Sequence, residues 1–281
     1  MSDDEEHKTM TGNSEGRVVL VTGASSGFGR ETAALLAERG WRVYGTSRRP
    51  SGCEESRFDL LELDVTSERS VTDCVGELLE REGRVDALVN NAGVVMGGAL
   101  EETSDDEALA LLQVNLLGPA RVARAVLPAM RSAGRGRIVN VGSLASMVGL
   151  PFQAWYSASK AGLALFSEGL RQEVRAQGVW VSLVEPGDFA TEISDHRLSV
   201  DKRLDVYAAA RERAVAVMAA DERSGPAPVV VARMVARALS DRRPRHCYRV
   251  GREVPWLTAA MALLPARFTE AAVRRLYRVD G

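Results

Sequence analysis

The chain has 281 residues, of which 46% are hydrophobic, and this is enough to bury one sizeable core. Thirty-six basic against thirty-eight acidic residues leave a formal net charge of −2, which gives no long-range field for nucleic acid or an acidic surface. Three cysteines without C-x-x-C spacing and three scattered histidines favour a reducing, cytoplasmic location and argue against a disulfide framework or a bound metal.

The order of elements along the chain predicts the fold. Residues 1–15 are acidic and polar and lack the apolar stretch of a secretory signal, so we expect a disordered acidic tail. Beyond them, apolar runs at 17–22, 41–47, 84–90, 136–143 and 179–186 alternate with helical stretches at 30–39, 71–81, 106–131 and 156–177. This alternation predicts an α/β fold, a doubly wound parallel sheet of Rossmann-like type, in a single domain over 16–251. Ligands of such sheets bind beyond the carboxyl ends of the strands.

A glycine-rich turn, "TGASSGFG" at 22–29, joins the first strand to a helix. Its spacing is Gly-x3-Gly-x-Gly, and glycines there let the backbone approach a pyrophosphate at the helix N-terminus. A plain structural turn is the alternative. The residues expected to contact a dinucleotide are Gly23, Ser25, Ser26, Gly27, Phe28 and Gly29.

The second strand ends in "GTSRRP", without the acidic residue that would bind an adenosine 2′-hydroxyl. Ser47 and Arg48 stand there instead, and a hydroxyl beside a guanidinium suits a 2′-phosphate. We therefore expect NADP(H) as the cofactor. The alternative is that Arg48 and Arg49 belong to an ordinary solvated loop.

In "WYSASK", Tyr156 and Lys160 are four residues apart, so on a helix their side chains are neighbours. A phenol has a pKa of about 10, and an ammonium about 5 Å away favours the phenolate by roughly 3 kcal/mol, or about two pKa units. The pair can then exchange a proton near neutral pH. A solvated helix face is the alternative for this pair taken alone.

Six short motifs occur in order: "TGASSGFG", "NNAG" at 90–93, Asn115, Ser143, "YSASK" at 156–160 and "PGDFAT" at 186–191. With them the chain resembles the classical short-chain dehydrogenases/reductases from about residue 17 to about residue 250. The stretches "SGPAPVVVARMVARAL" and "PRHCYRVG" are most similar to the group around 17β-hydroxysteroid and retinol dehydrogenases.

The resemblance implies a role for each catalytic residue. Tyr156 is the general acid in carbonyl reduction or the base in alcohol oxidation, and Lys160 also binds the nicotinamide ribose. Ser143 steadies the substrate oxygen, and Asn115 holds a water in a proton relay towards the lysine. It also implies cofactor contacts, for which a cap or turn role is the alternative, at Asp64, Val65, Asn91, Ala92, Gly93, Pro186, Gly187 and Thr191.

Residues 187–226 form a long segment at the mouth of the expected site, and we predict a helical substrate lid. Its apolar residues either wall a hydrophobic pocket or pack the lid onto the body. The candidates are Phe189, Ile193, Leu198 and Tyr207, together with Phe152 and Trp155. His196 is expected to be a surface residue.

Residues 252–281 form an amphipathic C-terminal extension whose longest uncharged run is too short for a transmembrane span. We expect it to cover the substrate pocket or a subunit interface, in preference to a membrane surface. The family resemblance implies a homodimer or homotetramer formed through the helices that contain Asn115 and Tyr156.

The sequence thus predicts an NADP(H)-dependent oxidoreductase that interconverts a ketone or aldehyde and an alcohol on an apolar small molecule. A non-catalytic NADP(H)-sensing protein on the same fold is the alternative, which the complete set of Ser143, Tyr156 and Lys160 disfavours. An epimerase of the extended type is disfavoured by the glycine spacing and by the lack of a separate substrate domain.

Overall fold

The computed structural model describes residues 16–50, 57–190, 198, 200–252 and 254–279. The expected acidic tail and the positions Thr191, Ile193 and His196 lie outside the described residues.

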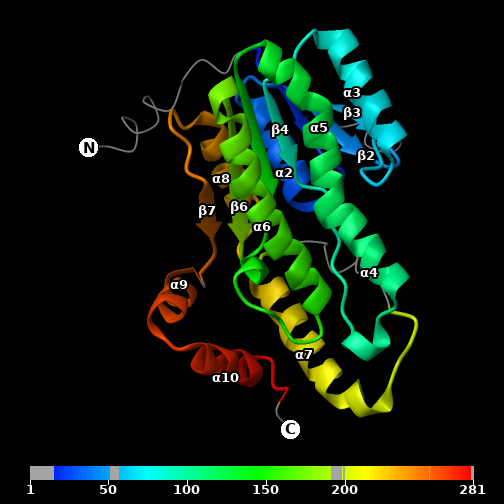
Figure 1. Ribbon diagram of the computed structural model, residues 1–281, viewed down its shortest axis with the longest axis vertical. Coiled ribbons are helices and arrows are strands. Elements are labelled where there is room, and N and C mark those ends of the chain that lie inside the picture. The colour runs from blue at the N-terminus through cyan, green and yellow to red at the C-terminus, as the bar shows by residue number, and fades with distance from the viewer. Residues whose placement is uncertain (1–15, 51–56, 191–197, 199, 253, 280–281) are drawn as a thin grey trace.

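A seven-stranded sheet with every neighbouring pair parallel forms the centre of the molecule (Figure 1). Its spatial order is β3-β2-β1-β4-β5-β6-β7, which confirms the predicted doubly wound fold. The five predicted strands are present, and β3 and β7 extend the two edges. The strands are β1 (Val18–Val21), β2 (Arg42–Ser47), β3 (Asp59–Glu62), β4 (Ala87–Asn90), β5 (Gly136–Val141), β6 (Val179–Pro186) and β7 (Cys247–Val250).

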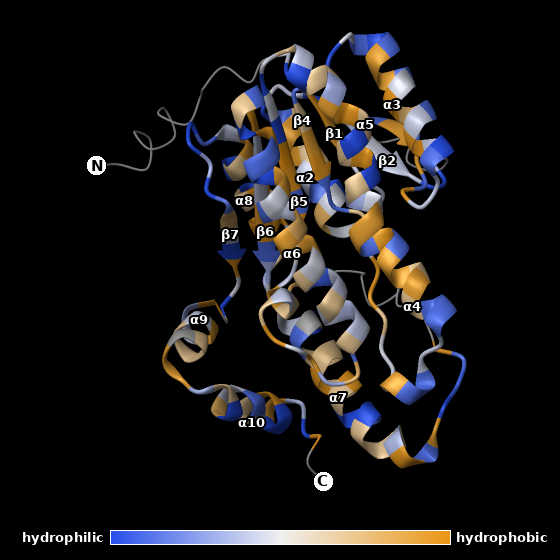
Figure 2. Ribbon diagram, viewed as in Figure 1, coloured by the Kyte–Doolittle hydropathy of each residue, from blue (hydrophilic) through white to orange (hydrophobic). Residues whose placement is uncertain are grey.

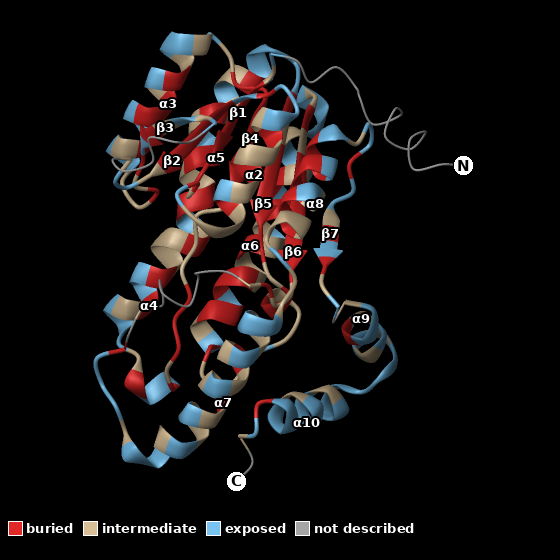
Figure 3. Ribbon diagram, turned by 180° about the vertical axis from the view of Figure 1, so that it is seen from behind, coloured by how far each residue is buried: buried red, intermediate tan, exposed pale blue. Residues whose placement is uncertain are grey.

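Helices cover both faces of the sheet, so its central strands are buried on both sides. One face carries α3 (Glu68–Glu82), α5 (Gly118–Ser132) and α6 (Ala154–Val174), and the other carries α2 (Gly27–Glu38) and α8 (Val229–Ser240). All four residues of β1 are fully buried. Figure 3 shows the buried residues concentrated in this sheet and its flanking helices.

The helix expected over 106–131 is divided in three. It runs as α4 (Asp105–Leu112), a π-helical turn η2 (Gln113–Leu117) and α5. Ser104 begins α4 with a capping box, in which its hydroxyl accepts from the backbone N–H of Glu107. Single π-helical turns inside helices are frequent at functional sites, and this one contains Asn115.

Three further helices lie beyond the carboxyl ends of the strands: α7 (Asp205–Ser224), α9 (Val254–Leu263) and α10 (Ala266–Leu276) (Figure 1). Short 3-10 turns are η1 (Leu100–Glu102), η3 (Leu144–Ser146) and η4 (Arg175–Gln177). Among the described residues, no helix is both long and apolar enough to span a bilayer.

Candidate active site

A cavity of about 660 Å³ opens at the carboxyl ends of the strands, where the strand order reverses between β1 and β4. Most of the predicted site residues line it, although Gly29 and Asn115 lie behind its wall. Those that line it are Gly23, Ser25, Ser26, Gly27, Phe28, Ser47, Arg48, Asp64, Val65, Asn91, Ala92, Gly93, Ser143, Tyr156, Lys160, Pro186 and Gly187.

The glycine turn leaves no room for side chains at two of its positions. Gly23 has a φ of +66°, and a Cβ there would lie 2.9 Å from the Cα of Ala92. A Cβ on Gly29 would lie 2.1 Å from the carbonyl oxygen of Gly23. The turn leads into α2, whose N-cap residue Ser26 makes no side-chain capping bond. Ser26, Gly27 and Phe28 at the start of α2 line the cavity, and the predicted pyrophosphate contact there stays a prediction.

Asn91 fixes the glycine turn from the neighbouring strand. Its side-chain amide donates to the carbonyl oxygens of Thr22 and Gly23, each at 3.0 Å. The Thr22 hydroxyl oxygen accepts from the backbone N–H groups of Asn91 and Ala92, both at 3.0 Å. The amide of Asn91 thus supports the cradle itself, and its predicted contact with the cofactor stays a prediction.

The end of β2 presents Ser47 half-buried and Arg48 exposed at the cavity wall. The Ser47 hydroxyl accepts from the backbone N–H of Arg49 at 3.2 Å, a local turn contact. Asp64 also makes a local turn, because its carboxylate accepts from the backbone N–H of Thr66 at 2.9 Å and from the Thr66 hydroxyl at 2.7 Å. Both residues combine the turn role with a place in the cavity wall.

Tyr156 and Lys160 lie side by side on α6 and are nearly buried, with 8% and 6% of their surfaces exposed. The Lys160 Nζ is 5.8 Å from the centre of the Tyr156 ring and donates to the carbonyl oxygen of Val141 at 3.2 Å. Burial lowers the pKa of the Lys160 ammonium to about 8. The pair therefore faces the cavity and does not form a solvated helix surface.

Replacing Lys160 with methionine is expected to raise the free energy of unfolding at pH 7 by about 1–2 kcal/mol, although activity is lost. The folded pKa of about 8 lies below the ordinary 10.5, so below pH 8 the full cost of burying the ammonium is present. Between pH 8 and 10.5 the folded protein loses this proton first and the cost disappears. Urea unfolding of both proteins at pH 7 and pH 10 checks this, and an equal difference at the two pH values contradicts it.

Ser143 and Asn115 are the other two residues of the predicted catalytic set. Ser143 follows β5 and its hydroxyl accepts from the backbone N–H of Ala145 at 3.1 Å. The side-chain amide of Asn115 accepts from the N–H of Val94 and donates to its carbonyl, both at 2.9 Å, and donates to the Ser159 hydroxyl at 3.1 Å. This amide therefore fixes the loop after β4, and the water relay implied by the resemblance stays a prediction.

The cavity is also lined by residues that sequence reasoning missed. Leu150, Gln153, Met218 and Tyr277 line it together with the predicted Phe189. Gln153 precedes Tyr156 by about one helical turn, and this spacing could have indicated that the two side chains lie on the same side of the helix. Met218 and Tyr277 come from α7 and from the residue after α10, and no sequence signal linked either to Tyr156.

The other candidate wall residues that the structure describes make packing contacts instead, and Ile193 lies outside the described residues. Phe152 and Tyr207 form an edge-to-face pair with ring centres 6.3 Å apart. Trp155 and Leu198 pack against a small cluster that includes Met96 and Tyr156. Of the candidate wall residues that the structure describes, Phe189 is the one that lines the cavity.

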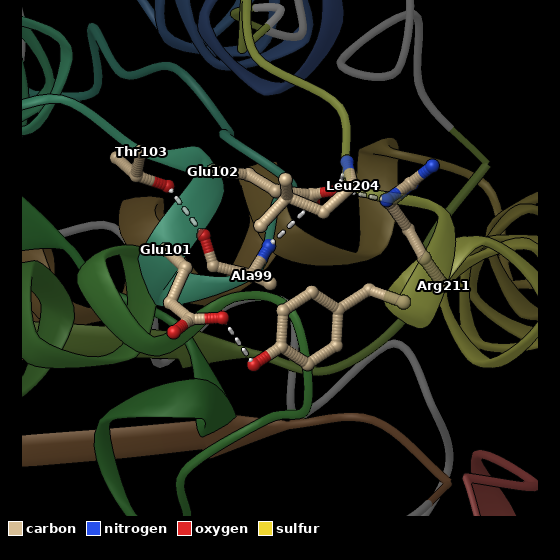
Figure 4. Close-up of polar contacts among 7 residues, drawn as sticks. Ala99, Glu101, Glu102, Thr103, Leu204 and Arg211 are labelled. Carbon is tan, nitrogen blue, oxygen red and sulfur yellow. Dashed lines mark hydrogen bonds and ion pairs between the residues drawn. The ribbon is translucent and has the colours of Figure 1, made fainter.

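A buried ion pair fastens α7 to the body of the fold (Figure 4). Glu102 on η1 is 2% exposed, and its carboxylate pairs with Arg211 on α7. It also accepts from the backbone N–H groups of Leu204 at 2.9 Å and Ala99 at 3.0 Å. Burial opposes ionisation of Glu102, but these N–H groups and Arg211 outweigh it and lower the pKa of the carboxyl group. The carboxylate therefore holds the start of α7, whose Met218 lines the cavity.

We expect Glu102→Gln to lower the free energy of unfolding by about 3 kcal/mol, because Arg211 is left partly buried without its counter-charge. The same change should raise KM for bulky ketones severalfold while leaving kcat for small ones nearly unchanged. The matched control is Glu101→Gln, which removes an exposed carboxylate that accepts from the Tyr207 hydroxyl and should cost less than about 1 kcal/mol. Equal effects of the two changes on stability and KM contradict the assignment.

The fold and the site together define a class: α/β oxidoreductases that bind a nicotinamide cofactor at the carboxyl ends of a parallel sheet. Residues 17–201 match the family model described as short chain dehydrogenase. The chain belongs to the short-chain dehydrogenase family, which confirms the resemblance inferred from its motifs.

Relatives and solved structures agree with this assignment. The chain is 37% identical over 266 residues to a 3-ketodihydrosphingosine reductase of Bacteroides thetaiotaomicron, covering 94% of this chain and 98% of the relative. It is 37% identical over 226 residues to the 3-oxoacyl-[acyl-carrier-protein] reductase FabG of Escherichia coli, covering 75% and 92%. A short-chain dehydrogenase structure from Streptomyces avermitilis superposes with a TM-score of 0.81 at 34% identity, covering 94% and 98%. A short-chain dehydrogenase/reductase from Burkholderia phymatum, solved with NAD, has a TM-score of 0.77 at 26% identity, covering 93% and 96%. The finer likeness to steroid and retinol dehydrogenases stays a prediction.

Proposed function

We propose that this enzyme reduces a ketone to an alcohol with NADPH, or runs the reverse oxidation, with Tyr156 as the general acid or base. The observation that carries the proposal is the buried pair of Tyr156 and Lys160 in the wall of the cavity that the glycine turn also lines. NADPH, when bound, supplies the hydride. The chain's own residues bind and orient the reactants and move one proton.

Proton transfer is assigned to the Tyr156 hydroxyl because it lies at the cavity, close to a cation. The Lys160 ammonium stabilises the phenolate left after the proton has moved to the new alkoxide. Ser143, at the end of β5, orients the carbonyl oxygen of the substrate by a hydrogen bond. Asn115 is proposed to position the loop after β4, since its amide is bonded to the backbone of Val94.

NADPH is proposed in preference to NADH because Arg48 is exposed at the cavity wall where a 2′-phosphate would lie, beside Ser47. Gly23 and the start of α2 are proposed to hold the pyrophosphate, while Gly29 permits the close packing of the turn behind them. Thr191, which the resemblance places beside the nicotinamide, lies outside the described residues.

The proposed substrate is a 3-keto compound with an apolar chain. The names of the two curated relatives both describe reductases of such compounds. The cavity offers a mostly apolar end at Leu150, Phe189 and Met218 for the chain. Gln153 is buried there and can bond a polar group beside the ketone.

A panel of ketones with both cofactors tests the proposal, and it includes a short water-soluble 3-keto ester, a long-chain 3-keto amine, a steroid and an aryl ketone. We expect NADPH oxidation with the 3-keto compounds, and kcat/KM that rises with chain length, because each buried methylene adds about 0.8 kcal/mol. If NADPH binds but no ketone is reduced, the protein is the non-catalytic NADP(H) sensor. If a steroid or an aryl ketone is the best substrate, the 3-keto assignment is overturned and the assignment as a ketone reductase stands.

Assembly and location are also proposed. Leu109, Leu117 and Leu165 are exposed by 55%, 42% and 72% on the α4–α6 helices that contain Asn115 and Tyr156, which supports a homodimer or homotetramer through those helices. Cys74 and Cys247, the two cysteines within the described residues, are free, and burial raises the pKa of each thiol to about 12, which supports a cytoplasmic setting.

A further inference from the structure

The last two helices form an arm, defined here as residues 254–279, that stands beside the body below β7 (Figure 1). None of the described side chains within the bounds of α10 is buried. The arm is anchored at its two ends by Leu257 and Tyr277, which are 9% and 8% exposed. Figure 3 shows α10 as an exposed helix, in contrast to the helices that pack on the sheet.

The arm carries six of the eleven large hydrophobic side chains that are exposed among the described residues, which is far more than its share of the chain. Leu263, the last residue of α9, is 80% exposed. Phe268 and Leu276 are eight residues apart on one side of α10 and are 50% and 48% exposed. Figure 2 shows hydrophobic and hydrophilic positions side by side along α10. The other three are Trp256 at 54%, Met261 at 41% and Leu264 at 48%.

Positive charge accompanies this apolar surface. Arg267, Arg274 and Arg275 on α10 are exposed, as is Arg278 just after the helix. Arg267 and Arg274 are seven residues apart on one side of α10, and the Arg267 guanidinium also lies 4.9 Å from the centre of the neighbouring Phe268 ring. The acidic side chain among the described residues of the arm is Glu270. The arm is therefore cationic on a chain whose formal net charge is −2.

We propose that the arm docks the enzyme on the surface of a bilayer that contains anionic lipids. A helix with an apolar side and an arginine-rich side lies in the plane of the headgroups, with its apolar side chains among the acyl chains. A second copy of the arm is a poorer partner, because it brings the same positive charge to the contact. Neutral surfaces leave the arginines without complementary charge.

The docked surface also borders the substrate cavity. Tyr277 directly follows the exposed Leu276, lines the cavity and packs against Ala214 and Met218 of α7. The Arg213 side chain donates to the carbonyl oxygen of Arg278 at 2.8 Å and ties the lid to the arm. This part of the inference rests on the proposed function. An apolar 3-keto substrate passes from the bilayer into the cavity beside Tyr277.

Flotation of the full chain with vesicles tests the proposal. Vesicles of phosphatidylcholine with about one third phosphatidylglycerol should bind the protein at least about tenfold more tightly than phosphatidylcholine alone, since each arginine contributes about 1 kcal/mol near an anionic surface. Arg267→Gln with Arg274→Gln should remove that preference. Leu263→Ser with Leu264→Ser should weaken binding to both vesicles by about tenfold or more. The matched control is Val206→Ser, also 80% exposed in the wild type but on α7, which should leave vesicle binding unchanged.

Three results overturn the docking proposal: no binding of the wild type to anionic vesicles, full binding by the double leucine variant, or no preference for anionic vesicles. If the double leucine change converts an oligomer to a monomer in sedimentation, the surface binds a second copy of the chain and the docking proposal is overturned. Thermal unfolding confirms that each variant is folded. Activity on a water-soluble 3-keto ester without vesicles is measured in parallel, so failure of the reductase proposal is seen separately from failure of docking.

Discussion

Tyr156→Phe is expected to lower kcat by at least about a hundredfold, because general acid–base catalysis typically contributes 10²–10⁴-fold. The phenylalanine ring fills the same buried place on α6 but has no proton to exchange. Cofactor affinity should stay close to that of the wild type, since the glycine turn and Lys160 are unchanged. Steady-state kinetics and NADPH titration by fluorescence measure the two effects.

The control is Tyr248→Phe on β7, which removes a phenol that donates to Asp241 at 2.6 Å, away from the cavity. It should lower the free energy of unfolding by about 1 kcal/mol and leave kcat near the wild-type value. A Tyr156→Phe enzyme that keeps more than about a tenth of the wild-type rate removes Tyr156 from the role of proton donor.

The second large effect concerns the choice of cofactor. NADPH should exceed NADH by at least about tenfold in kcat/KM, because a charge-assisted hydrogen bond to the 2′-phosphate contributes roughly 1.5–3 kcal/mol. Ser47→Asp combined with Arg48→Ala should reverse the order. The new carboxylate repels the phosphate and accepts from the ribose hydroxyls of NADH. Arg30, exposed just after the glycine turn, can share the phosphate contact, so Arg48→Ala alone should lose only part of the preference.

Arg49→Ala is the matched control, since Arg49 is the neighbouring exposed arginine. It should change the ratio of the two kcat/KM values far less than Arg48→Ala does. If Arg49→Ala changes this ratio more than Arg48→Ala does, the phosphate contact belongs to Arg49 and NADPH remains the proposed cofactor. Equal use of NADH and NADPH by the unmodified enzyme contradicts the interpretation of "GTSRRP" and leaves hydride transfer in place.

Local features of the sequence predicted the fold and much of the site. The turn at Gly23 and Gly29 and the four-residue spacing of Tyr156 and Lys160 each depend on neighbouring residues, so the sequence reveals them directly. The structure brings both to one cavity, as the rule for parallel sheets requires. Contacts between residues far apart in the chain leave no local pattern in the sequence, and these contacts were missed.

The ion pair of Glu102 and Arg211 joins residues 109 positions apart, and no periodicity connects them. Tyr277 reaches the cavity only because the arm folds back towards α7. The π-helical turn at Asn115 was also missed, since its amphipathic pattern continues that of α4 into α5. The expectation that segment 252–281 covers the pocket or an interface in preference to a membrane stays a prediction; the structure adds that Tyr277 reaches the cavity and that most large apolar side chains of the described arm are exposed.

The central claim is hydride transfer to a carbonyl with Tyr156 as the proton donor, and an isotope experiment tests it most directly. NADPH that carries deuterium at the transferable C4 position is incubated with a 3-keto ester, and the product is analysed by mass spectrometry. The account predicts an alcohol with one deuterium on the carbinol carbon from the wild type and almost none from Tyr156→Phe in the same time. Tight NADPH binding without labelled alcohol, or equal labelling by both proteins, contradicts it.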